Sequence, residues 1–287
     1  MHCFKQVAII GPGLLGASLA MACKKRLCGV EVRVWARRKE TLAICLKKNW
    51  CDSAHWAIAE AVEGSDLVVV CTPVESIANY ILEILSLCGE KTLVTDVGSV
   101  KGSICRTAQE QGQGNSSNFI GSHPMAGSEK SGMDFATGHL FEDRPCIVTP
   151  LSSSNPFDVE KISRFWADLG MKVFLQSPEE HDEIVANFSH FPHLIASPMA
   201  EFLSHLPTSW NKMAGQGFGD ATRIAQGDSD LWCQIMKMNQ SQLAKTLEKW
   251  MHSIQEAKSY LEQGKWEKLK EYLEKGSAFR KKWEWKE

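Results

Sequence analysis

Two short segments of the chain carry residue types that could do chemistry together. Gly11, Gly13 and Gly16 follow the apolar run Val7–Ile10 with the spacing G-x-G-x-x-G, the pattern by which a strand-to-helix turn binds the pyrophosphate of a dinucleotide. His123 begins the segment His-Pro-Met-Ala-Gly, and an imidazole titrates near neutral pH. A titratable ring near the reactive end of a dinucleotide predicts an enzyme that transfers a hydride.

The glycine spacing gains its specificity from its context, because a strand precedes it and a helix follows it. We expect the three glycines and the first helical residues, Leu14 and Leu15, to hold the pyrophosphate at the positive end of that helix. Further cofactor contacts are expected from Thr72 and Pro73 on the adenosine side and from Gly98 beside the nicotinamide. All three follow apolar runs typical of buried strands.

The end of the second predicted strand bears on which cofactor is used. NAD enzymes usually carry an acidic residue there, which binds the ribose 2'-hydroxyl, but this chain has Ala36 followed by Arg37 and Arg38. Two guanidinium groups could instead bind a 2'-phosphate. The sequence therefore slightly favours NADP over NAD, and it leaves open that the arginines only solvate the next helix.

Apolar runs alternate with helical segments through the first 176 residues. Helices are expected at several places, including Leu14–Arg26, Val74–Leu87 and Phe157–Leu169. Strands are expected at Val7–Ile10, Glu31–Trp35, Leu67–Cys71, Thr92–Asp96, Phe119–Ile120, Cys146–Val148 and Lys172–Leu175. This alternation predicts an α/β fold of the Rossmann type, with a doubly wound, mostly parallel sheet covered by helices on both faces.

After Pro178 the pattern changes to helices alone. Long amphipathic segments cover Glu179–Leu203 and Leu231–Lys282, and Ser177-Pro178-Glu179-Glu180 has the signature of a helix start with proline at the first position. We therefore predict two domains. Residues 1–176 form the dinucleotide-binding domain, and residues 177–287 form an all-helical domain for substrate binding and dimerisation.

Composition excludes several classes of function. The chain has 287 residues with 32 basic and 34 acidic side chains, so no basic field is expected to attract nucleic acid or a membrane surface. Ten cysteines lack any C-x-x-C spacing, which favours free thiols in a cytoplasmic protein. His190 and His193 have no third ligand at a suitable spacing, so no metal is expected.

Three further polar segments complete a recognisable set: Asp96-Val97-Gly98-Ser99-Val100-Lys101, Ser189-His190-Phe191-Pro192-His193, and Thr222-Arg223-Ile224-Ala225 with Asp228 and Trp232 after it. Together with His-Pro-Met-Ala-Gly, they resemble the prephenate and arogenate dehydrogenase family of tyrosine biosynthesis. The resemblance runs from Val7 to about Ile235. It is more specific than the glycines, because several motifs occur in order.

The resemblance implies oxidative decarboxylation of prephenate to 4-hydroxyphenylpyruvate by a homodimer that uses NADP or NAD. It implies that His123 is the general base for the ring alcohol, that Ser99 orients this alcohol, and that Arg223 binds a substrate carboxylate. Lesser roles are implied for other matching residues: substrate contacts for His190 and Lys101, ionic gating for Glu129 and Asp220, and closure over the pocket for Trp232.

Several alternatives stay open. Arogenate differs from prephenate only in an amino group that replaces a keto group, and no residue decides between them. A 3-hydroxyacid-type dehydrogenase would employ a catalytic lysine on the helical domain, such as Lys212 or Lys237, and a nucleotide-sensing module would need no base. His139 and His181 are expected to be structural. No separate regulatory domain is expected, so any inhibition by tyrosine would act at the active site itself.

Overall fold

The computed structural model describes residues 3–112, 114–127 and 132–282. By compactness the chain divides into two units, Met1–Gln240 and Ser241–Glu287. The predicted division between residues 176 and 177 is a different one and stays a prediction, because the first unit continues through four more α-helices.

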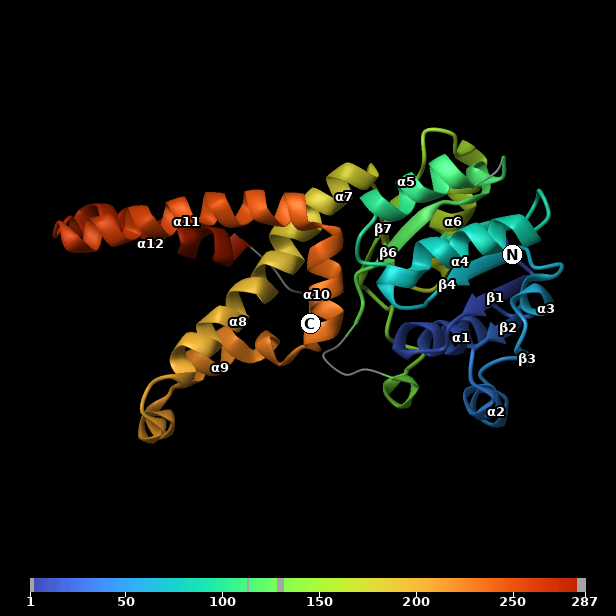
Figure 1. The fold of residues 1–287 in the computed structure, drawn as a ribbon, viewed down its shortest axis with the longest axis horizontal. Helices are drawn as coiled ribbons and strands as arrows, with labels where there is room; N and C mark the ends of the chain where they lie inside the picture. Colours follow the sequence, from blue (N-terminus) through green and yellow to red (C-terminus); the bar gives the residue numbers. More distant parts are fainter. Residues whose placement is uncertain (1–2, 113, 128–131, 283–287) are drawn as a thin grey trace. The chain divides into compact units, whose positions relative to one another are not determined.

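A five-stranded parallel sheet forms the centre of the first unit (Figure 1). Its strands, in the order β3-β2-β1-β4-β5, are β1 (Gln6–Ile10), β2 (Glu31–Trp35), β3 (Ser53–His55), β4 (Leu67–Val70) and β5 (Leu93–Asp96). The strand order reverses beside β1, and ligands of such sheets bind at this switch point, beyond the carboxyl ends of the strands. The glycine segment follows β1 and therefore lies at that point.

Helices cover both faces of this sheet, as predicted. Val7 and Ile9 of β1 belong to one buried cluster, and Ala8 and Ile10 belong to another, as expected when successive side chains of a strand point to opposite faces. The first cluster contains residues of α1 (Leu14–Arg26), α2 (Lys39–Lys47) and α6 (Pro156–Asp168), and the second contains residues of α3 (Ile58–Val62), α4 (Val74–Leu87) and α5 (Gly102–Gln111).

A smaller, separate sheet follows, with β6 (Gly121–Pro124) antiparallel to β7 (Pro145–Thr149), and β7 parallel to β8 (Lys172–Leu175). Two 3-10 turns, η1 (Ser116–Asn118) and η2 (Met133–Phe135), flank β6. The predicted strand Phe119–Ile120 is wrong in its bounds: both residues are buried, but Phe119 makes only an isolated bridge to Val94. The hydrophobicity of Phe119 and Ile120 indicated burial, not strand pairing. The strand β6 begins at Gly121 instead, and His123 lies within it.

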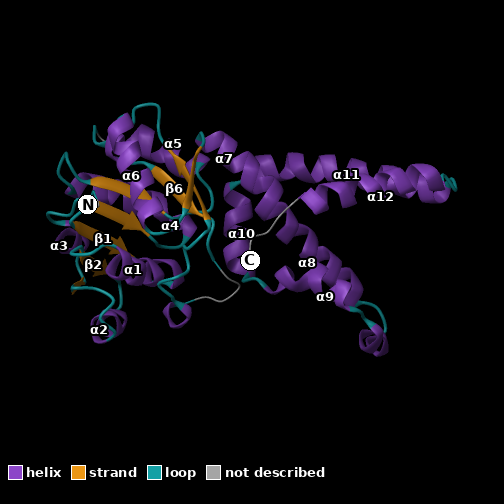
Figure 2. Ribbon diagram, turned by 180° about the vertical axis from the view of Figure 1, so that it is seen from behind, coloured by secondary structure: helices purple, strands orange, loops and turns teal. Residues whose placement is uncertain are grey.

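The rest of the first unit is helical, and Figure 2 shows no strand after β8 in the described residues. The elements are α7 (Pro178–Val185), a π-helical turn η3 (Ala186–His190), α8 (Phe191–Ser204), η4 (Thr208–Met213), α9 (Gln216–Thr222), η5 (Arg223–Gln226) and α10 (Ser229–Met238). Ser177 and Glu180 form a capping box at the start of α7, with the Ser177 hydroxyl accepting from the Glu180 N–H at 3.2 Å. This confirms the predicted helix start.

The second unit consists mainly of two helices, α11 (Gln240–Glu262) and α12 (Trp266–Lys282). Gly264 has φ +64° in the turn between them, and the hydroxyls of Ser253 and Tyr272 lie 2.9 Å apart across the pair. The predicted amphipathic segment Leu231–Lys282 therefore contains parts of three helices. No helix in the described ranges combines the length and apolar character needed to cross a bilayer.

Candidate active site

Gly11, Gly13 and Gly16 are each glycine for a different structural reason. Gly11 has φ +97°, which side-chain-bearing residues rarely adopt. A Cβ on Gly16 would lie 2.1 Å from the Gly11 carbonyl oxygen, so α1 packs against the turn only without a side chain there. A Cβ on Gly13 would meet nothing within 4 Å. The open space is therefore at Gly13, where a pyrophosphate would approach the backbone.

The start of α1 fits a bound dinucleotide. Its N-cap residue, Gly13, provides no side-chain cap, and no acidic residue lies in the first turn. The first N–H groups of a helix have no partner within the helix and carry partial positive charge. Leu14 and Leu15 begin the helix and are half-buried. These residues fit the pyrophosphate of NAD or NADP.

Arg37 and Arg38 are exposed at the end of β2, directly after the buried Ala36. The Trp56 indole N–H donates to the Arg37 carbonyl at 3.2 Å, which holds the backbone of this turn. Neither guanidinium has an ion-pair partner among the described residues. Both therefore remain available for a phosphate.

The remaining predicted cofactor residues follow β4 and β5. Thr72 is half-buried, and its hydroxyl accepts from the Ser76 hydroxyl at 3.1 Å, while Pro73 caps the start of α4. Gly98 is buried, and a Cβ there would lie 2.8 Å from an Asp96 carboxylate oxygen. This glycine thus has a packing reason that the sequence motif does not reveal.

Lys101 occupies a different place from the one expected. Its side chain is fully buried, and its ammonium donates to the Asp96 carboxylate and, at 3.0 Å, to the Ser122 carbonyl. The Asp96 carboxylate also accepts from the Ser122 N–H at 3.2 Å. This contradicts a direct substrate contact by Lys101, because its charge is neutralised inside the protein, where the pair fixes the residue before His123.

His123 lies on β6, paired with Ile147 of β7, and only 7% of it is exposed. Its Nδ1 lies 2.8 Å from Nε2 of His181, which is fully buried in α7. His181 Nδ1 in turn lies 2.9 Å from the carboxylate of Asp182. His181 was expected to be structural, but it contacts the predicted base directly.

Asp182 is a second residue that sequence reasoning missed. Its carboxylate accepts from the backbone N–H groups of Lys101 and Gly102, at 2.7 and 2.9 Å, at the start of α5. Its backbone carbonyl accepts from the Asn239 side-chain amide at 2.8 Å. No local pattern could have revealed these contacts, because Asp182 and Lys101 are 81 residues apart in the sequence.

His190 lies in the π-helical turn and is fully buried. Its Nδ1 lies 3.2 Å from the Asn239 amide nitrogen, and its Nε2 has no hydrogen-bond partner within normal geometry in the described structure. The backbone of the half-buried Ser99 lies near this ring. We call His123, His181 and His190, with Asp182 and Asn239, the histidine cluster.

Burial keeps the imidazoles of the cluster neutral. It lowers the pKa of His123 well below 6.5, and the neighbouring His181, Lys101 and His190 lower it further. Burial also lowers the pKa of His181, although Asp182 opposes this shift. The pKa of His190 is lowered to about 4, again mainly by burial. The cluster is therefore able to accept a proton at neutral pH.

Arg223 is exposed at the start of η5 and has no ion-pair partner among the described residues. Its guanidinium lies close enough to His193 to lower the pKa of that ring, which burial lowers more strongly. The His193 ring stacks on Trp232 with 3.5 Å between ring centroids, and His190 meets the same indole edge-on at 6.2 Å. Arg223 is thus linked to the histidine cluster through His193 and then Trp232.

Two predicted gate residues remain without support from geometry. Asp220 is exposed in α9, and Glu129 lies outside the described residues. No group of three potential metal ligands occurs in the described ranges. All ten cysteines are free thiols.

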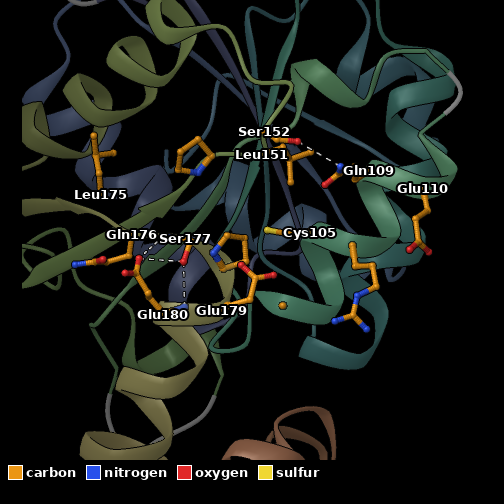
Figure 3. A pocket seen from close by; sticks show the side chains of 14 residues that line it. Cys105, Gln109, Glu110, Leu151, Ser152, Leu175, Gln176, Ser177, Glu179 and Glu180 are labelled. Carbon is orange, nitrogen blue, oxygen red and sulfur yellow. Dashed lines mark hydrogen bonds between the residues drawn. The ribbon is translucent and has the colours of Figure 1, made fainter.

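A separate hollow of about 700 Å³ lies between α5 and the start of α7 (Figure 3). Its lining includes Arg106, Gln109 and Glu179 but none of the predicted catalytic, substrate or cofactor residues. Large pockets are the usual first hypothesis for an active site. Here the buried imidazoles and the glycine turn lie elsewhere, so we place the candidate site by its chemistry rather than by the size of this hollow.

Comparison with known proteins matches both parts of the chain to one family. The family model "Prephenate dehydrogenase, nucleotide-binding domain" matches residues 19–175, and "Prephenate dehydrogenase, dimerization domain" matches residues 177–275. The first match begins after the glycine turn, so the assignment of that turn rests on its geometry.

Whole proteins are similar over nearly the full chain. The cyclohexadienyl dehydrogenase of Zymomonas mobilis is 31% identical over 265 residues, which cover 90% of this chain and 89% of that protein. The structure of A. aeolicus prephenate dehydrogenase in complex with hydroxyphenyl propionate and NAD+ is 28% identical with a TM-score of 0.89, covering 97% of this chain and 98% of that one.

A third relative is the Synechocystis arogenate dehydrogenase, whose structure is 26% identical with a TM-score of 0.85, covering 96% of this chain and 99% of that one. Fold, site chemistry and similarity over both parts of the chain agree. The chain belongs to the prephenate dehydrogenase family of oxidoreductases.

Proposed function

We propose that the protein oxidatively decarboxylates prephenate to 4-hydroxyphenylpyruvate in tyrosine biosynthesis, with hydride transfer to NAD or NADP. The observation that carries this proposal is the buried, neutral imidazole of His123, held at 2.8 Å by His181. A neutral imidazole has a free lone pair and can take a proton at neutral pH.

His123 takes the proton of the ring alcohol. As the hydride leaves the carbon that carries this alcohol, the hydroxyl becomes more acidic, and a base within hydrogen-bond reach lowers the barrier. Ser99 lies in the loop between β5 and α5 and orients the alcohol with its hydroxyl. The bound NAD or NADP supplies the acceptor for the hydride.

Arg223 binds a carboxylate of the substrate. Prephenate has two carboxylates, one on the ring and one on the pyruvyl side chain, and a planar guanidinium can hold such a group with two parallel hydrogen bonds. The exposed, unpaired Arg223 meets this need. Loss of the ring carboxylate as carbon dioxide makes the ring aromatic, so the reaction runs essentially one way.

A kinetic assay tests this proposal. Purified protein is given prephenate or arogenate with NAD or NADP, and reduction of the cofactor is followed by absorbance. We expect turnover of prephenate with at least one cofactor. Turnover of neither substrate with either cofactor would contradict the proposed reaction.

Arogenate is the second candidate substrate, supported by the similarity to the Synechocystis arogenate dehydrogenase. The same assay separates the two, because the preferred substrate has the higher kcat/KM. A 3-hydroxyacid-type reaction has less support. Lys237 is exposed and lies 3.8 Å from Glu75, and Lys212 is also exposed, so neither has the desolvated setting of a catalytic lysine.

We propose NADP as the slightly preferred cofactor, with Arg37 and Arg38 binding its 2'-phosphate. The support is that both guanidiniums are exposed and unpaired beside the buried Ala36. Arg37→Asp should shift the ratio of kcat/KM values toward NAD, whereas Lys47→Asp, on the exposed end of α2, should leave it unchanged. An unchanged ratio in Arg37→Asp would show that Arg37 is only surface charge.

We propose a homodimer in the cytoplasm. The family model that matches residues 177–275 is a dimerization domain, and large apolar side chains are exposed on the two last helices, with Trp266 and Leu273 each 62% exposed. Sedimentation at micromolar concentration should give twice the chain mass. A monomer under the same conditions would contradict the dimer without affecting the proposed reaction.

A further inference from the structure

We infer that Asp182 is a positioning residue that gives two histidines of the site opposite roles, leaving Nε2 of His123 a bare acceptor and Nε2 of His190 a donor. The inference rests on the proposed function, because it explains how His123 is ready to take a proton. It follows from the carboxylate and the backbone carbonyl of Asp182, because both groups can only accept hydrogen bonds.

The first branch runs through the carboxylate of Asp182. An ionised carboxylate only accepts hydrogen bonds, so the His181 Nδ1 at 2.9 Å must carry a proton. The neutral His181 ring then has a bare Nε2. His123 Nδ1 lies 2.8 Å from it and must donate, so the lone pair of the neutral His123 ring is at Nε2, the atom left for the substrate.

The second branch runs through the backbone carbonyl of Asp182. A carbonyl cannot donate, so the Asn239 atom at 2.8 Å must be the amide nitrogen. This nitrogen is also 3.2 Å from Nδ1 of His190, which must then accept. The neutral His190 ring therefore carries its proton on Nε2, the fully buried atom that has no partner within normal geometry in the described structure.

Asp182 itself is rigidly held. Its carboxylate accepts two backbone N–H groups at the first turn of the ten-residue helix α5, where the helix dipole favours negative charge. A Cβ on Gly102 would lie 2.7 Å from the carboxylate, so the close approach depends on glycine there. A residue that acts only as a helix cap would need neither His181 nor Asn239.

The charged and titratable neighbours of the cluster act in both directions, and together with burial they leave the rings neutral. Lys101 and the other two histidines disfavour a charge on His123. Asp182 and Asp96 favour a charge on His181, but burial and Lys101 outweigh them, and burial likewise outweighs Asp182 at His190. A proton delivered to Nε2 of His123 would make an imidazolium. Its Nδ1 proton would be hydrogen-bonded to His181, which in turn donates to the Asp182 carboxylate.

The direct test is nitrogen NMR of 15N-histidine-labelled wild-type protein with NAD bound. We expect the His123 ring to show a protonated Nδ1 and an unprotonated Nε2, and the His190 ring to show the reverse. His123→Asn and His190→Asn variants assign the signals. A wild-type His123 with its proton on Nε2 would overturn the inference, whether or not the protein turns over prephenate.

Two substitutions separate the branches. Asp182→Asn removes the obligatory acceptor and should mix the His123 tautomers and lower kcat by roughly 10² to 10⁴, since the same change in a serine-protease triad lowers kcat about 10⁴-fold through the wrong tautomer. Asn239→Leu should leave the His123 signals unchanged but shift those of His190 and raise KM. Thermal unfolding and NAD binding identify a misfolded variant.

The outcomes distinguish this inference from the proposed function. Wild-type tautomers as expected, in a protein that oxidises neither substrate, would contradict the reaction and keep the positioning. An active wild type whose Asp182→Asn variant folds and keeps full kcat, with unchanged His123 signals, would overturn the positioning and keep the reaction.

Discussion

The turn after β1 and the histidine cluster are built in opposite ways. The turn is made by three glycines within six residues and works through backbone. The cluster joins β6, α7, η3 and the residue after α10. It works mainly through side chains, and three of its contacts span 49 to 58 residues of sequence. A site made by local backbone can be inferred from spacing, whereas one made by distant side chains requires the fold.

The largest effect should come from His123→Asn, which removes the base and leaves the glycine turn intact. We expect kcat to fall by about 10² to 10⁴, with NAD binding unchanged because the substitution lies outside the turn. His139→Asn, a change at a histidine whose side chain is 64% exposed, is the matched control. A parallel loss of NAD binding in His123→Asn would show that the two regions are not independent.

Arg223→Ala should separate substrate binding from proton transfer. A charge-assisted hydrogen bond contributes about 1.5 to 3 kcal/mol, so we expect KM to rise on the order of ten- to a hundredfold with a smaller change in kcat. Arg164→Ala, an exposed arginine on α6, should leave both constants unchanged. If kcat fell while KM held, Arg223 would act in the reaction step instead.

A pair of alanine substitutions tests the turn itself. Gly16→Ala should destabilise the fold by about 1 to 3 kcal/mol, because its Cβ would lie 2.1 Å from the Gly11 oxygen. Gly13→Ala has open space at its Cβ, so the unfolding temperature should hold while NAD binding weakens about tenfold, the loss of one charge-assisted contact. Calorimetry measures both, and the reverse pattern would refute the assignment of roles.

The smallest effect should be in stability against pH. The folded-state pKa values of His123, His181 and His190 lie below 6.5, so the unfolded chain binds more protons as the pH falls below 6.5. Stability should therefore be full above that pH and be lost progressively below it. Thermal unfolding between pH 7.5 and 5 measures the slope. His123→Asn should flatten it, and an equally steep slope would mean that His123 is protonated in the folded state.

The sequence predicted the fold more completely than the site. Alternating apolar runs marked seven strand positions, but β3 was missed because Ser53 and His55 give it no apolar signal. Phe119 and Ile120 were assigned to a strand that begins only at Gly121. The spacing of apolar residues along the sequence predicts which segments are buried, but it predicts the ends of strands less accurately.

Within the site, motif residues were found and their partners were not. Ser99 and His190, which come from two different motifs, lie near each other. Lys101 was assigned to substrate, yet it pairs with Asp96 inside the protein, because burial of a lysine cannot be inferred from spacing. His181 and Asp182 carry no motif of their own, and only folding brings them to His123.

The attachment of Asp182 to the first turn of α5 makes proton acceptance depend on how two parts of the first unit meet. If α7 moved away from α5 by even one bond length, the imidazole on β6 would keep its place but lose the neighbour that dictates which nitrogen is bare. The enzyme would then still hold its coenzyme but react more slowly, as expected for Asp182→Asn. The contact between α5 and α7 is thus a condition for fast proton transfer.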